Sequence, residues 1–135
     1  MKEEEKENLF ITFQQTIESI IIDKQKNPKN EKLLNNFNAK INLGLQIDED
    51  YYFWVNLLAK EGNYSLNRGR LEEYDLELMM TPEDMLFFSN GENSILNMMM
   101  KKNSFGYRKL RFSKSSNGKR NIGMLLKLSK ILVLG

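Results

Sequence analysis

The sequence predicts an α+β fold in the order helix, four strands, two helices, strand and helix. Three observations support this order: a helical repeat of apolar residues near the N-terminus, four successive segments in which apolar and polar residues alternate, and apolar helical segments on either side of a further strand. A chain of 135 residues is typical of one domain. We therefore expect one domain over 1–135, with an N-terminal amphipathic helical segment at 1–37 and the sheet and remaining helices at 38–134.

The first predicted element is a long amphipathic helix from Glu3 to about Lys26. Its apolar residues recur at steps of three and four: Phe10, Phe13, Ile17 and Ile21. Asn27-Pro28 ends this helix, because proline disfavours helical geometry in the residue before it. The apolar residues of 33–37 then form either a short helical turn or an extended lead-in to the sheet.

Four strands are expected next. The run 39–47 alternates apolar with polar residues, which indicates a half-buried strand. In 51–60 large side chains occupy both faces, so we expect both faces to be covered. Shorter alternations at 64–66 and 74–78 predict a third and a fourth strand, with Asp75 and Glu77 facing solvent. Because the connections are short, we expect these strands to pair in order as an antiparallel meander.

Two short helices, a strand and a final helix complete the predicted order. Thr81 is a suitable N-cap for the first helix, Pro82 suits its first position, and Gly91 supplies a left-handed stop. The later elements are expected at about 93–102 for the second helix, 108–114 for the strand and 121–134 for the final helix. In the strand, Leu110 and Phe112 are expected to face inward.

The composition excludes several classes of enzyme. The chain has no histidine and no cysteine, which removes serine-hydrolase triads, cysteine proteases, the usual zinc sites and disulfides. We expect no catalytic activity, no cofactor and no metal. No apolar run is long enough to span a membrane, and the acidic start is unlike a secretory signal, so we expect a cytoplasmic location.

Positive charge gathers in the last third of the chain. From Lys101 onward there are ten Lys or Arg residues and no Asp or Glu, although the net charge is only +2. This asymmetry indicates an anionic partner such as a phosphate group, a membrane surface or nucleic acid. Phe105, Tyr107 and Phe112 interleave with the charges, a pattern that also suits stacking on single-stranded nucleic acid. As an explanation of this basic segment, we favour a solvated strand and turn without a partner. Attraction to an anionic lipid head group or a coenzyme A phosphate comes second, and nucleic acid comes last.

The methionines are concentrated in the two short helices and the strand before them. Six of the eight lie between Met79 and Met100. Apolar residues of the second helix spread over an arc of about 200° and those of the last helix over about 220°, whereas a stripe somewhat wider than about 100° suffices for a surface helix. These two helices therefore have more apolar surface than one sheet face covers. The additional surface fits either packing in the core or a homodimer interface, or the flexible wall of a cavity that holds an apolar guest. Periodicity leaves both interpretations open.

Six short motifs follow one another over the last hundred or so residues. They are Leu76–Met79 as a strand, Thr81–Leu86 as a helix entry, Gly91 between two helices, Ile95–Met100 as an apolar helix, Lys109–Phe112 as a strand and Met124–Leu128 as a C-terminal helix. In this order, the region from about Asn38 to Leu134 resembles the lipid-binding domains of the sterol carrier protein 2 family. Compared with the pattern of that family, the segments 102–108 and 115–119 resemble insertions.

The resemblance implies an antiparallel or mixed sheet of about five strands, with helices packed over one face and an apolar tunnel enclosed. It also implies a carrier without catalytic residues for a fatty acid, fatty acyl-CoA, sterol or phospholipid. The ligand-binding candidates carried over by position are Phe87, Phe88, Ile95, Met98, Met99, Leu125 and Leu128. Lys102, Arg108 and Arg111 are the candidate contacts to an anionic head group, and they also suit an anionic membrane surface.

Overall fold

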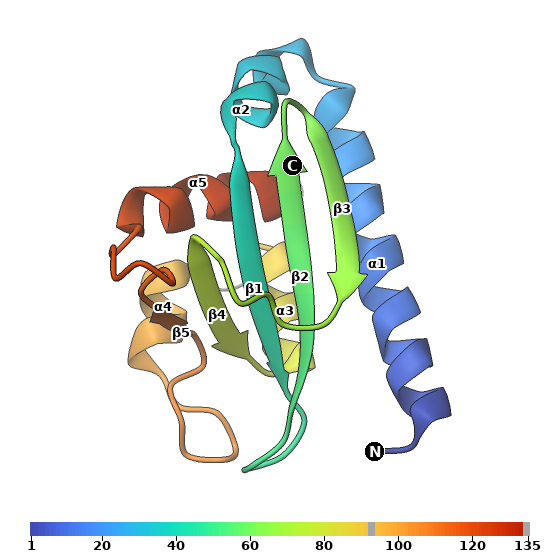
Figure 1. Ribbon diagram of the computed structural model, residues 1–135, viewed down its shortest axis with the longest axis vertical. Helices are drawn as coiled ribbons and strands as arrows, with labels where there is room; N and C mark the ends of the chain where they lie inside the picture. The colour runs from blue at the N-terminus through green and yellow to red at the C-terminus, as the bar shows by residue number, and fades with distance from the viewer. Residues whose placement is uncertain (92–93, 134–135) are drawn as a thin grey trace.

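A computed structural model describes residues 1–91 and 94–133, without the side chain of Phe87. It is an α+β fold with a five-stranded mixed sheet in the order β3-β2-β1-β4-β5, as expected, and helices cover one face of the sheet (Figure 1). The helical elements are α1 (Glu3–Gln25), the 3-10 turn η1 (Pro28–Asn30), α2 (Glu31–Asn36), α3 (Pro82–Ser89), α4 (Ile95–Met100) and α5 (Ile122–Leu132). The strands are β1 (Ala39–Gln46), β2 (Tyr52–Lys60), β3 (Asn63–Arg68), β4 (Leu76–Met80) and β5 (Arg111–Ser113).

Helix α1 contacts β3 and α5 through its apolar stripe. Phe13 and Ile17 are buried in the core, which confirms the predicted inward face. Near its start, Arg68 of β3 donates to Glu3 at 2.9 Å and to Glu7 at 3.1 Å. The hydrogen bond from Arg68 holds the pKa of Glu3 below its ordinary value. Because exposed ion pairs contribute little to stability, the apolar stripe is the main attachment of α1.

The expected meander is correct for three strands and wrong for the fourth. Strands β1, β2 and β3 pair antiparallel with their neighbours. Strand β4 instead runs parallel to β1, with Leu78 opposite Leu43, and β5 pairs antiparallel with β4. The reason is the crossover segment 69–75, which passes over the face of the sheet away from the helices and starts β4 beside β1 (Figure 1). We call that face the outer face.

Buried polar side chains on the outer face hold the crossover segment. The side-chain amide of Asn42, fully buried, donates to the carbonyl of Leu71 at 3.0 Å and accepts from its N–H at 2.8 Å. Arg70 donates to Glu77 through Nε at 3.0 Å and Nη2 at 2.6 Å, which raises the pKa of Arg70. Glu77 is only 2% exposed, so the expectation that it faces solvent is wrong. The crossover segment supplies the partners that this buried carboxylate needs.

Trp54 explains the glycine in the middle of β1. A Cβ atom at Gly44 would lie 2.8 Å from Cη2 of Trp54, so the indole needs the bare backbone there. The guanidinium of Arg70 lies 4.2 Å from the centroid of the same ring. The prediction that both faces of β2 are covered is confirmed at this residue.

The late elements are shorter than the sequence predicted. Helix α4 ends at Met100 and strand β5 has three residues, because 102–108 folds into a hairpin closed by a bridge between Lys102 and Arg108. The predicted start of the second helix at Asn93 and the predicted end of the last helix at Leu134 lie outside the described residues.

Tyr64 makes the stability of this fold sensitive to alkaline pH. Its hydroxyl donates to the carbonyl of Leu34 at 2.9 Å, and burial raises its pKa from 10.0 to about 12. Since the folded protein retains this proton longer than the unfolded chain, the contribution to stability is complete below pH 10 and falls as the pH rises to about 12. Urea unfolding at several pH values is expected to show that fall.

Tyr64→Phe is the matched control for this effect. The variant is expected to lose about 1 kcal/mol at neutral pH with the hydrogen bond, and to show a shallower alkaline decline. An alkaline decline as steep as that of the unaltered protein would show that Tyr64 is not responsible.

Candidate functional site

An open pocket of about 720 Å³ lies among the helices, where α1, α3 and α5 end and α4 begins. We call it the helical pocket. It is lined by Lys24, Asn30, Leu33, Phe88, Gly91, Ser94, Ile95, Leu96, Leu126, Ser129, Lys130 and Val133. Its volume falls within the range of about 300–1,000 Å³ that is usual for small-molecule sites. Half of these residues are large and apolar, so the pocket offers an apolar guest contacts from several elements.

Local chain signals shape one wall of the pocket. Gly91, with a φ of 76°, follows the end of α3 and reverses the chain. Ser94 then caps α4, its hydroxyl accepting from the N–H of Asn97 at 3.2 Å. A Cβ atom at Gly91 would lie only 3.5 Å from Cγ1 of Val133, so this turn packs against the end of α5. The two caps therefore place Phe88 and Ile95 at one opening.

The predicted ligand-binding residues separate into a lining set and a core set. Phe88 and Ile95 line the helical pocket. The core set is fully buried: Met98, Leu125 and Leu128. Met99 is half-buried and packs on that core, while the side chain of Phe87 lies outside the described part of the structure. An enclosed tunnel running through the core residues stays a prediction.

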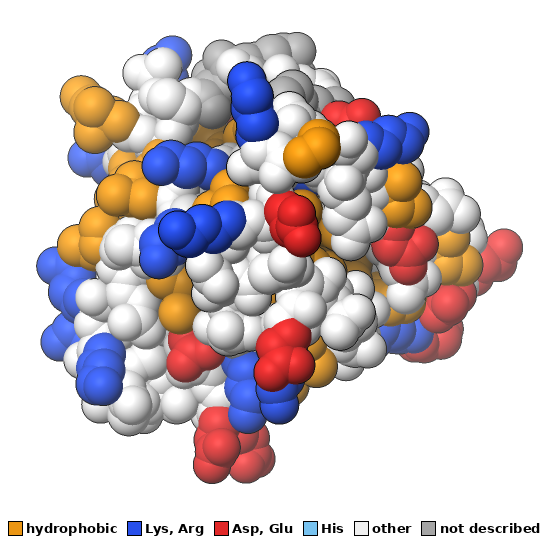
Figure 2. All heavy atoms as spheres, turned by 90° about the horizontal axis from the view of Figure 1, so that it is seen from above, with side chains coloured by type: hydrophobic (Ala, Val, Ile, Leu, Met, Phe, Trp, Pro, Cys, Tyr) orange, Lys and Arg blue, Asp and Glu red, His pale blue; other side chains and the backbone are white. Residues whose placement is uncertain are grey.

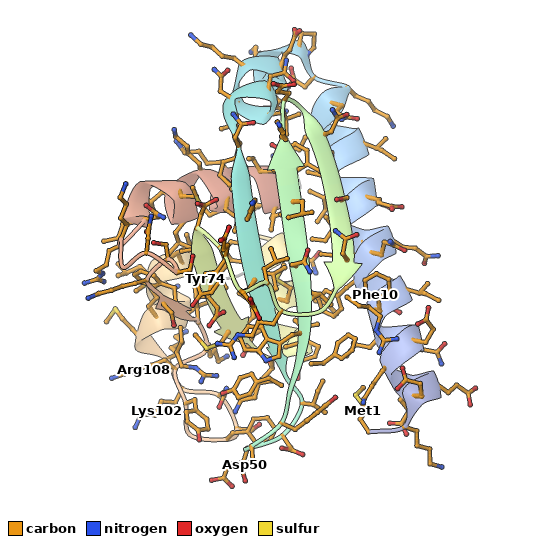
Figure 3. The ribbon with its side chains drawn as sticks, in the orientation of Figure 1. Met1, Phe10, Asp50, Tyr74, Lys102 and Arg108 are labelled. Atoms are coloured by element: carbon orange, nitrogen blue, oxygen red, sulfur yellow. The ribbon has the colours of Figure 1, made fainter. Side chains whose placement is uncertain are left out.

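The three basic residues predicted to contact an anionic head group lie outside the helical pocket. Lys102 and Arg108 lie near the turn that holds Asp50, at the far end of the sheet from α2 (Figure 3). Arg108 donates to the carbonyl of Met100 at 2.5 Å. Arg111 lies on the outer face and donates to the hydroxyl of Tyr52 at 2.7 Å. None of the three lines the helical pocket.

Sequence reasoning placed ligand-binding residues on α5 at Leu125 and Leu128 but missed the stripe of this helix that lines the helical pocket. Leu126, Ser129, Lys130 and Val133 line it at steps i, i+3, i+4 and i+7, which place them on one helical stripe. A second stripe of α5 faces the core: Leu125, Leu128, Ile131 and Leu132. The wide apolar arc of this helix was the signal, because an arc too wide for one face serves two surfaces.

The electrostatics of the helical pocket favour a negative group at its rim. Lys130 is exposed among the lining residues, and no Asp or Glu is among those that the structure describes there. Viewed from above, Lys and Arg side chains gather among hydrophobic ones on the left, the side where α5 lies, and most Asp and Glu side chains lie to the right and below (Figure 2). Over the described residues, no group of three Asp or Glu side chains forms a metal site.

Solved structures of known proteins share this fold. The sterol carrier protein domain 2 of Helicoverpa armigera is 14% identical, with a TM-score of 0.61 over 86% of this chain and 81% of its own. The apo form of sterol carrier protein 2 from Yarrowia lipolytica is 14% identical, with a TM-score of 0.59 over 89% and 86%. The fold is that of sterol carrier protein 2.

The sterol carrier protein 2 fold also occurs in the ubiquinone synthesis protein UbiJ-SCP2. That structure is 7% identical to this chain, with a TM-score of 0.60 over 85% of this chain and 87% of its own. No protein-family model matches the sequence, and no curated protein matches it significantly. The expected sheet with helices over one face is confirmed. Within the described residues, no helix has both the length and the apolar character needed to cross a bilayer.

Proposed function

We propose that this protein is a non-enzymatic carrier of a lipid with a long apolar chain, and that the helical pocket receives that chain. The ligand classes are those expected from the sequence: a fatty acid, fatty acyl-CoA, sterol or phospholipid. The observation that carries the proposal is the convergence of apolar side chains from several helical elements on one open pocket without an acidic side chain among its described lining. The sterol carrier proteins of Helicoverpa armigera and Yarrowia lipolytica have the same fold, which supports the proposal.

The driving force for binding is burial of the apolar chain. Each buried methylene contributes about 0.8 kcal/mol, so ten methylenes contribute about 8 kcal/mol before the cost of association is subtracted. Ile95 and Val133 line the pocket and pack directly on the core that contains Met98. Because methionine adapts its shape at little cost, a longer chain is accommodated by moving Met98 and Met99.

Native mass spectrometry of the purified full chain, before and after organic extraction, tests the proposal. The expected result is a bound lipid that extraction removes, followed by saturable uptake of a fluorescent fatty acid by the extracted protein. A chain that carries no lipid and takes up no fatty acid, acyl-CoA or sterol would refute the carrier function.

Lys130 gives the pocket a preference for anionic head groups. It is an exposed side chain at the rim, and its ammonium group attracts the carboxylate of a fatty acid. Lys130→Gln is expected to weaken fatty acid binding about two- to fivefold, the usual effect of an exposed ion pair, and to leave the corresponding fatty alcohol unaffected. Competition against a fluorescent fatty acid measures both ligands.

Lys127→Gln is the control for the Lys130 experiment. Lys127 is also exposed on α5 but does not line the helical pocket. Equal loss of fatty acid affinity in the two variants would show that only the general positive charge of α5 matters.

Self-association through α4 is the second candidate function. Leu96 and Met100 on this helix are 67% and 64% exposed, so α4 offers two large apolar side chains to a partner surface. Sedimentation of the lipid-free chain distinguishes the two functions. A dimer that Met100→Asp dissociates, combined with no lipid uptake, would favour an interaction module.

A further inference from the structure

A second pocket, of about 520 Å³, lies at the other end of α3 and shares no lining residue with the helical pocket. We call it the loop pocket. Its walls include Gln46 at the end of β1, Thr81 and Asp84 at the start of α3, and Lys102 and Ser104 in the hairpin 102–108. The positive end of the α3 dipole therefore lies at this pocket.

The amide of Asn103 has only one orientation that satisfies its surroundings. Its Oδ1 accepts from the backbone N–H groups of Phe105 at 2.9 Å and Tyr107 at 3.2 Å. Backbone N–H groups are donors only, so Oδ1 must face them and Nδ2 must point the other way. That Nδ2 donates to Oε1 of Gln46 at 3.0 Å.

The orientation of Gln46 follows from that of Asn103. Its Oε1 also accepts from Nη2 of Arg111 at 2.9 Å, and a guanidinium is never an acceptor. Two donors therefore fix Oε1, and Nε2 is the atom left over. Gln46 is 1% exposed, and its Nε2 has no hydrogen-bond partner. Exchanging the amide oxygen and nitrogen of Gln46 does not remove this problem. It would place Nε2, a donor, against the donors Nδ2 of Asn103 and Nη2 of Arg111.

The half-buried guanidinium of Arg111, beside Gln46, also has a donor without an acceptor. Arg111 bonds only to neutral groups, Tyr52 and Gln46, and stacks on the ring of Tyr107 at 4.7 Å. Its Nε is buried without a partner, and it forms no ion pair with any described carboxylate. Burying a cation without a counter-charge is unfavourable. The network therefore has a positive charge and two unused donors.

The surface of the loop pocket carries charges of both signs, from Lys102, Lys109, Glu83 and Asp84. Lys102 is exposed at the pocket, and no ion pair of this side chain occurs among the described residues. Lys109 also lines the pocket, but Asp84 lies 3.7 Å from its ammonium group and offsets it. Glu83 is the other acidic lining residue; it is exposed and forms no ion pair with Lys102 among the described residues, so the charge of Lys102 is not offset by a direct contact.

We propose that the loop pocket binds a phosphate group, with Nε2 of Gln46 donating to a phosphate oxygen and Lys102 pairing with its charge. Phosphate suits the site because it accepts several hydrogen bonds and is negative at neutral pH. The same chemistry belongs to free phosphate compounds and to the head group of a phospholipid. The proposal is independent of lipid binding in the helical pocket.

Gln46→Glu is the decisive variant. Glutamate has nearly the same shape and keeps the oxygen that accepts from Asn103 and Arg111, and it supplies the missing counter-charge to Arg111. The variant is therefore expected to melt at or above the temperature of the unaltered protein. It removes the free donor and places a carboxylate in the pocket, so affinity for inorganic phosphate is expected to fall about tenfold or more.

Amide chemical shifts of the full chain, titrated with inorganic phosphate at constant ionic strength, measure that affinity. The expected result is saturable shifts at Gln46, Asn103 and Ser104 that disappear in Gln46→Glu, weaken in Lys102→Gln and persist in Lys127→Gln. Lys127 is an exposed lysine of α5 outside the loop pocket, so it controls for net charge. Shifts that never saturate, or that Gln46→Glu leaves unchanged, would overturn the proposal.

The source of the phosphate is tested with vesicles of phosphatidylcholine, with and without phosphatidic acid. Cosedimentation that requires phosphatidic acid and is lost in Gln46→Glu identifies a head group as the natural ligand. Saturable phosphate binding without such cosedimentation identifies a soluble phosphate compound. If Gln46→Glu proves unfolded by circular dichroism, Lys102→Gln decides, and unchanged phosphate affinity in that exposed variant counts against the site.

Discussion

Leu126→Asp is expected to abolish fatty acid uptake, with affinity lowered about 100-fold or more, which corresponds to about 2.7 kcal/mol. Leu126 lines the helical pocket, so the new carboxylate would lose its water when an apolar chain enters. The side chain is already 51% exposed in the free protein, and the substitution therefore leaves the folded state close to its original stability. Titration with a fluorescent fatty acid measures the effect.

Ile122→Asp is the matched control for Leu126→Asp. Ile122 lies on the same helix and is 46% exposed, but it does not line the helical pocket. Both variants add one negative charge to α5, so only the position of the charge differs. Equal fatty acid affinity in the two variants, whether both normal or both lost, would place the binding site elsewhere.

Arg70→Ala is expected to destabilise the fold by about 3 kcal/mol, toward the lower end of the range for breaking a buried ion pair. The side chain of Glu77 is only 3% exposed and loses both guanidinium contacts in this variant, while that of Arg70 is half-exposed, which reduces the effect through solvent screening. The variant also uncovers the ring of Trp54. Urea unfolding followed by the fluorescence of this single tryptophan measures the loss.

Two further variants isolate the buried pair. Arg70→Ala combined with Glu77→Gln is expected to recover part of the lost stability, because no buried carboxylate remains unpaired. Arg68→Ala removes an arginine whose partners Glu3 and Glu7 are exposed, so a much smaller effect is expected. A loss in Arg68→Ala as large as that in Arg70→Ala would mean that burial of Glu77 does not determine the difference.

The positions of the strands in the sequence were predictable because the two faces of each strand differ. The order in which the strands lie in the sheet was not predictable. Alternation in 39–47 and 51–60 identified β1 and β2 and their inward faces. Nothing in the local pattern showed that 69–75 crosses the sheet, since that path depends on Asn42 and Glu77 being buried under it. Polar residues in an alternating strand are usually exposed, and here a covering segment buries them.

The candidate site was partly predictable for a similar reason. Phe88 and Ile95 were among the candidates and line the helical pocket. Arg111 lies between Leu110 and Phe112, both expected to face inward, so its outward direction already followed from strand alternation. The role of Leu126 did not follow from the sequence, because the wide apolar arc of α5 does not show which of its residues meet the core and which line a pocket.

The crossover also has a consequence for the order of folding. Hydrogen bonds within β1, β2 and β3 form between neighbouring segments, whereas Asn42 and Glu77 are 35 positions apart. Pairings between distant segments form late, since closing the intervening chain comes before any gain from the contact. The walls that α3, α4 and α5 contribute all follow β4 in the chain. During synthesis the helical pocket is therefore complete only after Val133 has left the ribosome, whereas β1, β2 and β3 are available to pair before its last walls exist.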